Sequence, residues 1–100
     1  MRRARIDVPK EKIHDFCRKH HIRKLAFFGS VLRDDFADGS DIDVLVEFEP
    51  GHVPGLEFFA MEDELGKILG RKVDLNTPQF LSRYYRDQAL AEAEVQYVAP

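Results

Sequence analysis

The sequence predicts a domain of the α+β (α/β) class, because segments with the period of a helix alternate with short runs of strand formers. Apolar residues recur at helical spacing at about 9–20, 56–69 and 78–90. Runs rich in β-branched and aromatic residues lie at 22–28, 41–48 and 71–75. The chain has 100 residues and no internal repeat, so we expect one domain, 1–100, that buries roughly 60–70% of its unfolded surface.

The first predicted helix begins at Pro9 and ends at about His20. Proline is favoured in the first turn of a helix, where the N–H that it lacks would be unpaired in any case. Ile13, Phe16 and Cys17 then mark the apolar side. Because the chain has one cysteine, Cys17 forms no internal disulfide, and we expect a small buried residue in a reducing compartment.

Three histidines near the end of this helix raise the alternative of a metal site. They are His14, His20 and His21. No cysteine or third clustered ligand accompanies them, and the helical pattern already explains their positions. We therefore expect them not to bind a metal.

The strand formers at 22–28 lead directly into a turn of small residues, Gly29 and Ser30. Glycine lets the backbone come close to a ligand, and N–H groups that open a helical turn attract anionic oxygens. The next strand begins with Asp41 and Asp43. Side chains two apart in a strand point the same way, so both carboxylates project from one face while the alternate apolar residues line the other.

Neighbouring carboxylates repel each other, and a divalent cation between them removes that conflict. Oxygen-only ligands favour Mg²⁺ or Mn²⁺ over zinc, and Mg²⁺ keeps positions open for water and substrate phosphates. The turn and the two aspartates together predict a metal–nucleotide site. A calcium loop around Gly39 is excluded, because the alignment would put Phe36 and Leu45 where oxygen ligands belong.

The second half of the chain predicts two further helices and one or two strands. An apolar stripe at 56–69 indicates a core helix that Gly70 ends. In the strand 71–75, Asp74 points away from the buried face. Thr77 and Pro78 predict the start of a helix through about residue 90, and 95–98 is either a closing strand or a frayed end.

The composition limits the classes of partner. The net charge is −3, and the basic residues form small separate clusters without an extended stripe, so we do not expect nucleic acid binding. There is no signal-peptide core after the N-terminal arginines and no apolar run long enough to cross a membrane. We therefore expect a soluble protein of the cytoplasm.

Gly29-Ser30, ten residues, and then Asp41-x-Asp43 is a pattern that resembles the nucleotidyltransferase superfamily typified by DNA polymerase beta. The chain is more closely similar to the minimal nucleotidyltransferases, small prokaryotic proteins that keep little beyond the catalytic core. This likeness covers nearly the whole chain, through the segments 28–33, 40–48, 70–75 and 77–78. Asp34 and Asp35 stand in a loop where relatives often carry small residues.

The resemblance implies a nucleotidyltransferase fold: a mixed sheet with helices packed on one side and the active site on an open edge. By position, Asp41 and Asp43 would bridge two Mg²⁺ ions, and Asp74 would complete the shell of the catalytic metal. The nucleotide-binding residues would be Gly29, Ser30, Arg33 and Ser40. A surface salt bridge is the alternative role for Arg33.

The activity that the resemblance implies is transfer of AMP from ATP. An acceptor hydroxyl attacks the α-phosphate, and pyrophosphate leaves. Minimal nucleotidyltransferases are commonly paired with a HEPN-domain protein, a small helical ribonuclease toxin, as its antitoxin. In that interpretation the acceptor is a tyrosine of the toxin.

Two other functions stay open at this stage. The chain could neutralise a partner by binding alone, although such a protein has no evident need for three aspartates. It could also modify RNA or a small molecule, although so short a chain has little room for a substrate-binding domain. A hetero-oligomer, or self-association through Phe58-Phe59 and Tyr84-Tyr85, could supply the missing surface.

Overall fold

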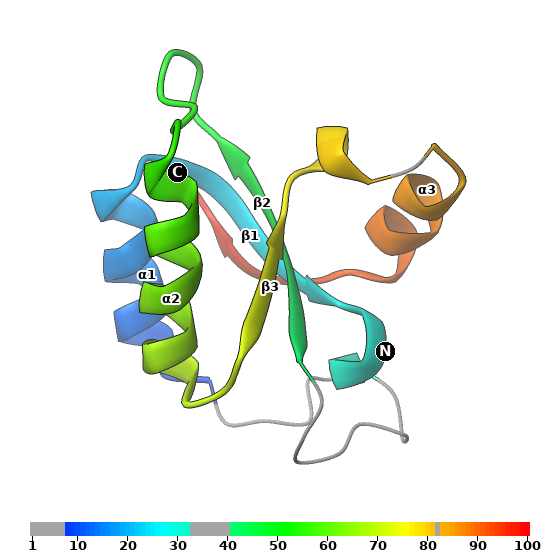
Figure 1. Ribbon diagram of the computed structural model, residues 1–100, viewed down its shortest axis with the longest axis horizontal. Helices are drawn as coiled ribbons and strands as arrows, with labels where there is room; N and C mark the ends of the chain where they lie inside the picture. The colour runs from blue at the N-terminus through cyan, green and yellow to red at the C-terminus, as the bar shows by residue number, and fades with distance from the viewer. Residues whose placement is uncertain (1–7, 33–40, 82) are drawn as a thin grey trace.

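The computed structural model describes residues 8–32, 41–81 and 83–100. Three helices and four strands carry the fold, with two short 3₁₀ turns, η1 and η2 (Figure 1). In chain order the elements are α1 Lys10–Lys19, β1 Ile22–Phe28, η1 Gly29–Leu32, β2 Ile42–Phe48, α2 Glu57–Leu69, β3 Val73–Asn76, η2 Pro78–Phe80, α3 Arg83–Glu92 and β4 Glu94–Val98. The predicted helices at 9–20 and 56–69 are confirmed, and 94–98 is a strand.

The four strands form one sheet in the order β3-β2-β1-β4. β1 is antiparallel to both β2 and β4, whereas β2 and β3 are parallel. The sheet is therefore mixed, as expected. The parallel pair requires a crossover, and α2 supplies it. β3 is an edge strand that pairs with only the first four residues of β2, from Ile42 to Leu45.

Helices α1 and α2 lie side by side over one face of the sheet (Figure 1). Alternate strand residues face them, which is the period-two pattern of a sheet with one buried face. Burial of these side chains is the main stabilising term of the fold. The principal core consists of Ile13, Phe16, Cys17, Ile22, Leu25, Phe27, Val31, Leu32, Ile42, Val44, Val46, Met61, Leu65, Val73, Leu75 and Tyr97.

The third helix, α3, packs on the opposite face of the sheet. Its Ala89 joins Phe28 and Leu45 in a second, smaller cluster, and these two strand residues point away from α1 and α2. The expected packing of helices on one side of the sheet therefore holds for α1 and α2 but not for α3. The strand β2 is buried on both faces at residues 44–46, which explains its nearly continuous apolar sequence.

The helix expected after Thr77 is interrupted. Pro78–Phe80 forms only a 3₁₀ turn, Leu81 is extended with φ −83° and ψ 144°, and α3 begins at Arg83. Thr77 makes no side-chain cap hydrogen bond. The physical reason is tertiary packing, because the extended residue lets Leu81 pack against the cluster of Phe28, Leu45 and Ala89.

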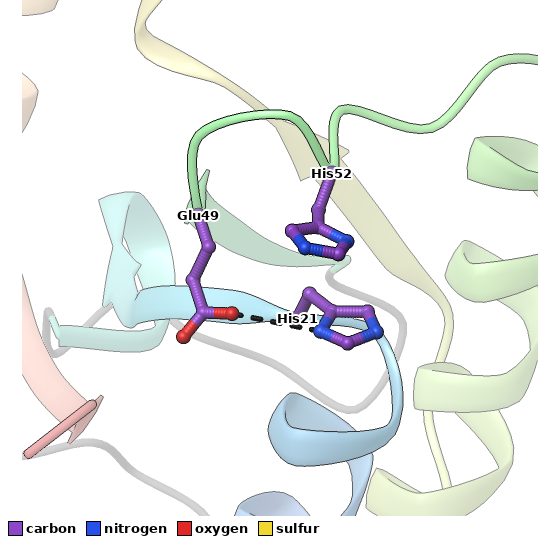
Figure 2. A group of neighbouring side chains, drawn as sticks. All are labelled: His21, Glu49 and His52. Carbon is purple, nitrogen blue, oxygen red and sulfur yellow. Dashed lines mark ion pairs between the residues drawn. The ribbon is translucent and has the colours of Figure 1, made fainter.

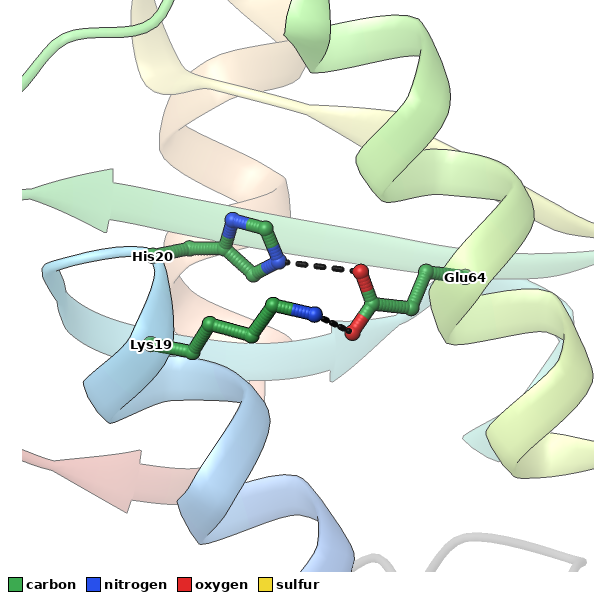
Figure 3. Close-up of polar contacts among 3 residues, drawn as sticks. All are labelled: Lys19, His20 and Glu64. Carbon is green, nitrogen blue, oxygen red and sulfur yellow. Dashed lines mark hydrogen bonds and ion pairs between the residues drawn. The ribbon is translucent and has the colours of Figure 1, made fainter.

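Two ion pairs hold the C-terminal end of α1 against α2. The carboxylate of Glu64 on α2 accepts a hydrogen bond from Lys19 Nζ at 3.1 Å. Its other oxygen lies 3.1 Å from His20 Nε2 (Figure 3). Burial alone would raise the pKa of Glu64, but the hydrogen bonds from Lys19 and His20 outweigh it and lower the pKa below its ordinary value. The deprotonated form of Glu64 is thus the one that fits this helix pair.

Cys17 lies fully buried and unpaired between α1 and the sheet. Burial raises the pKa of its thiol to about 12, with a smaller opposing effect of Arg18. The side chain therefore behaves as a small apolar residue, as the sequence predicts. In the part of the chain that the structure describes, no helix has the length and apolar character needed to cross a membrane.

Candidate active site

The register of the two parallel strands places two of the predicted carboxylates next to each other. Asp43 of β2 is paired with Asp74 of β3, and paired strands lie about 4.8 Å apart. The flanking residues of both strands are buried under α1 and α2, so both aspartates project from the other face. Asp43 is half-buried and Asp74 is exposed.

The small-residue turn meets this pair directly. Phe28, the last residue of β1, is paired with Asp43, so the turn begins beside the carboxylate. Gly29 has φ 76°, a conformation that residues with a side chain rarely adopt. A methyl group at this position would overlap Asp43 Oδ2 and lie 3.2 Å from Asp43 Cγ. Glycine is thus required both by its backbone conformation and by the approach of the carboxylate.

Two buried side chains hold the turn η1 in place, and one polar residue of the turn faces solvent. Val31 and Leu32 are buried in the principal core, whereas Ser30 stays partly exposed. The core therefore holds the backbone around Gly29 and Ser30 beside Asp43. This is the arrangement expected of a segment that grips a ligand through rigid backbone and one hydroxyl.

Asp41 is exposed and directly precedes β2. The parallel ladder starts one residue later, where the Ile42 N–H donates to the Lys72 carbonyl at 2.9 Å. Among the described residues, the oxygens of Asp41, Asp43 and Asp74 are not gathered within 4.8 Å of one another. Arg33 and Ser40, the other predicted nucleotide-binding residues, lie outside the described residues.

The donors at this end of the sheet fit a hard divalent cation. Carboxylate oxygens are the ligands that Mg²⁺ prefers, and the carboxylate of Asp43 rests against a glycine backbone rather than a bulky side chain. The chain's four histidines lie elsewhere. His14 packs edge-on against Tyr97, and His20 contacts Glu64.

The premise that no third ligand lies near the histidines is wrong for His21, whereas their not binding a metal stays a prediction. His21 does have clustered partners, Glu49 and His52, whose ligand atoms all lie within 4.8 Å of one another and of its own. They are far from His21 in the sequence, so no short spacing pattern connects them with it. The sheet brings them together, because the end of β2 lies beside the start of β1.

Glu62 contacts the strand that carries Asp74, a contact that no sequence pattern predicts. Its Oε2 accepts a hydrogen bond of 2.8 Å from the Leu75 N–H. β3 is an edge strand, and an unpaired edge N–H is a site of fraying or unwanted pairing. Glu62 therefore ties the edge strand to α2 one residue after Asp74 and helps to fix that carboxylate.

A cavity of about 770 Å³ reaches Asp74 from the outer side of β3. It lies where β2 continues beyond its pairing with β3, and the loop before α2 forms its other wall. Its volume is within the range of ligand sites, roughly 300–1,000 Å³. The lining residues are Arg23, Val46, Glu47, Phe48, Val53, Pro54, Gly55, Phe58, Phe59, Glu62, Asp74, Leu75, Thr77, Pro78 and Gln79.

Comparison with known proteins decides the family. The model of the nucleotidyltransferase domain family matches residues 10–95, most of the chain. The chain belongs to this family. A protein of Methanocaldococcus jannaschii, provisionally named a protein adenylyltransferase, is 36% identical over 88 residues, which cover 88% of this chain and 94% of that protein.

Solved structures agree with this assignment. A structure described as a minimal nucleotidyltransferase has a TM-score of 0.71 and 33% identity, and the match covers 85% of this chain and 86% of that one. A complex of a tri-AMPylated HEPN toxin of Shewanella oneidensis with its MNT antitoxin matches with a TM-score of 0.65, 20% identity and coverage of 90% and 70%. At that identity the second match supports the fold alone.

The chain is therefore a nucleotidyltransferase with the mixed sheet of its family. Asp43, Asp74 and the turn at Gly29 lie at the end of the sheet where β1 ends and β2 begins. These are residues that the sequence pattern singled out.

Proposed function

We propose that this nucleotidyltransferase transfers AMP from ATP to a tyrosine hydroxyl of a HEPN-domain ribonuclease toxin and so acts as its antitoxin. The observation that carries the proposal is the pairing of Asp43 with Asp74 beside the tight turn at Gly29. Support for a protein acceptor comes from relatives named protein adenylyltransferases and from the AMPylated toxin held by a protein of the same fold.

In this proposal Asp41, Asp43 and Asp74 hold Mg²⁺, as two ions, with Mn²⁺ as a substitute. When bound, the cations neutralise the charge on the phosphates and favour ionisation of the acceptor hydroxyl. The acceptor oxygen forms a bond to the α-phosphorus, and the bond from that phosphorus to pyrophosphate breaks. The hydroxyl proton passes to a nearby base, for which the exposed Asp74 is our candidate.

The remaining predicted residues position the nucleotide. We propose that the backbone at Gly29 and the hydroxyl of Ser30 hold phosphate oxygens, with Arg33 and Ser40 completing the set. Phosphoryl transfer gains most from such positioning and charge stabilisation. Because Asp74 is exposed, a hydroxyl on the surface of another protein can reach it.

The direct test is transfer of label from α-labelled ATP to a purified HEPN-domain partner in the presence of Mg²⁺. We expect label with the wild-type chain and a loss of at least about a hundredfold in Asp41→Asn/Asp43→Asn, the scale that a group acting on the transferred phosphoryl contributes. Asp63→Asn is the matched control, because Asp63 is an exposed aspartate on α2. Equal labelling by all three proteins would exclude the proposed site.

A second candidate is neutralisation of a partner by binding alone. Exposed apolar side chains near the cavity favour it, since Val53, Leu56 and Phe59 are 76%, 86% and 66% exposed. Asp43→Asn distinguishes the two functions. A variant that no longer transfers AMP yet still blocks the toxin would favour binding.

A further inference from the structure

A second group of metal-binding side chains lies at the far end of β2 from the aspartates. His21, Glu49 and His52 each offer one ligand atom, and these atoms all lie within 4.8 Å of one another (Figure 2). Asp43 and Glu49 are six residues apart along an extended strand, which is roughly 20 Å. The group is therefore separate from the nucleotidyl-transfer site.

The backbone itself brings these three residues together. The Glu49 N–H donates to the His21 carbonyl at 2.9 Å, and the His52 N–H donates to the Glu49 carbonyl at 3.0 Å. Pro50 and Gly51, with φ 82° at the glycine, occupy the central positions of that turn, which is the pattern of a type II turn. The hydrogen bonds and turn thus fix the positions from which all three side chains extend.

His21 directly follows the C-cap of α1 and has a left-handed backbone. It has φ 56° and is the one non-glycine residue with positive φ in the described part of the chain. This left-handed region suits glycine better than residues with a Cβ. A left-handed residue at this position is a common way for a helix to end, so the end of α1 fixes where the His21 side chain leaves the backbone.

The side chains are already oriented toward each other. The rings of His21 and His52 are stacked with centroids 3.9 Å apart and an interplanar angle of 18°. His21 Nδ1 lies 3.5 Å from Glu49 Oε2, and the dashed line in Figure 2 marks this ion pair. In the structure this ion pair and the ring stack hold the three side chains next to one another.

We propose that His21, Glu49 and His52 form a binding site for a divalent transition-metal ion, with Zn²⁺ as the ion that fits best. Two imidazoles and one carboxylate are a recurrent zinc donor set that leaves a fourth position for water or a partner's side chain. Ligand atoms of a tetrahedral zinc site lie roughly 3.4 Å apart, given bonds of about 2.0–2.1 Å. His21 and His52 are exposed and Glu49 is half-buried, so small side-chain rotations would bring the three ligand atoms to this spacing.

The site has a consequence for the neighbouring cavity. His52 is followed directly by Val53, Pro54 and Gly55, which line the cavity that reaches Asp74. A metal that ties His52 to His21 would hold the start of this loop against the end of α1. The proposed ion thus stiffens one wall of the cavity without touching the aspartates.

Titration of the metal-free chain with Zn²⁺, followed by calorimetry and by melting temperature, tests the proposal. We expect one ion per chain and a higher melting temperature, since a ligand that binds only the folded state stabilises it. Affinity should fall at least about tenfold in His52→Gln and in Glu49→Gln, the scale that even outer-sphere partners of metal ligands contribute. His14→Gln and Glu57→Gln are the matched controls and should bind as the wild type does.

His21→Gly is the most discriminating variant. Glycine suits the backbone at this position, so the metal-free variant should melt at the same temperature as the wild type or higher. Its response to Zn²⁺ should be lost. In Asp41→Asn/Asp43→Asn, Zn²⁺ binding should be unchanged, which separates this proposal from the proposed transferase activity.

Two outcomes would overturn the proposal. One is Zn²⁺ binding that is equally strong in His21→Gly, His52→Gln and Glu49→Gln, which would place the ion elsewhere. The other is no binding by the wild type at a Zn²⁺ concentration of about a millimolar, well above the affinities of protein zinc sites. Substitution by Co²⁺, whose visible absorption reports nitrogen and oxygen ligands, gives an independent readout.

Discussion

At the level of single residues, the candidate active site depends on the close approach of the Gly29 backbone to the Asp43 carboxylate. Gly29 combines a positive φ with a position at which a methyl group would overlap Asp43 Oδ2. Gly51 has a similar φ of 82° but open space around the same position. Alanine substitutions at these two glycines therefore distinguish the free-energy cost of the backbone conformation from the cost of crowding the Asp43 carboxylate.

We expect Gly29→Ala to lower the free energy of unfolding by about 2–4 kcal/mol. Roughly 1 kcal/mol comes from the left-handed backbone and roughly 1–3 kcal/mol from the overlap with Asp43. Gly51→Ala should show only the first part. Chemical denaturation of both variants measures the difference, and equal losses would mean that Asp43 does not crowd the turn.

Much of the site's residue content could be predicted from the sequence. The local pattern indicates Gly29 and Asp43, and the family resemblance adds Asp74; the strand pairing places Asp43 beside Asp74 and beside the residue before Gly29. The role of Glu62 could not be predicted, because the apolar pattern of helix 56–69 does not indicate which of its carboxylates reaches a neighbouring strand. His52 was not connected with His21, because a tight turn and a strand pairing decide their proximity.

At the scale of elements, the edge strand β3 carries Asp74 and is held on one side by a side chain. Only four residues of β3 pair with β2, and the Leu75 N–H on the outer edge is satisfied by Glu62. A short edge strand with one such tie is prone to local opening. The stability of β3 at Leu75 therefore affects the position of the Asp74 carboxylate.

We expect Glu62→Ala to destabilise the fold by about 1 kcal/mol, the usual net worth of a hydrogen bond. Amide exchange at Leu75 should become much faster, because its N–H then faces solvent. Glu62→Gln keeps an acceptor oxygen and should restore most of the protection. The neighbouring exposed Asp63→Ala is the control. Unchanged exchange at Leu75 in Glu62→Ala would show that the edge is held by something else.

The ion pairs between α1 and α2 give the fold a pH dependence. The pKa of Glu64 is lowered in the folded chain, so its contribution is fully present above the ordinary carboxyl pKa, about 4.3. It is lost as the pH falls through the lower folded value, because protonation then costs less in the unfolded chain than in the folded one.

We therefore expect Glu64→Gln to be less stable than the wild type at pH 7, by less than about 1 kcal/mol, since the pair is partly exposed and screened. The two proteins should converge in stability as the pH is lowered below about 4. Thermal unfolding between pH 3 and 7 measures this. Glu57→Gln, on the exposed first turn of α2, is the control. A difference that persists at pH 3 would contradict the electrostatic origin.

At the scale of the whole molecule, the sequence predicts the elements better than their arrangement. Helix and strand periods identify α1, α2 and the three strands that carry the site. The position of α3 on the opposite face depends on Leu81, Ala89 and their contacts with Phe28 and Leu45, which no local pattern contains. The break before α3 has the same origin, because packing overrides the helix signal of Thr77 and Pro78.

The arrangement gives the sheet two ends with different chemistry. Carboxylates and the glycine turn lie at the start of β2, and imidazoles with one carboxylate lie beyond its end. Hard and borderline cations prefer these two donor sets respectively. We therefore expect Mg²⁺ to support nucleotidyl transfer at one end of the sheet and Zn²⁺ to bind at the other.

Intact mass spectrometry of a co-expressed HEPN-domain partner, after incubation with ATP and Mg²⁺, is the direct test of AMP transfer to protein. We expect a mass increase of one or more AMP units with the wild-type chain and with Asp63→Asn. We expect none with Asp43→Asn or Asp74→Asn, although both should remain folded and bound to the partner. An unmodified partner in a stable complex with the wild-type chain would contradict transfer to protein.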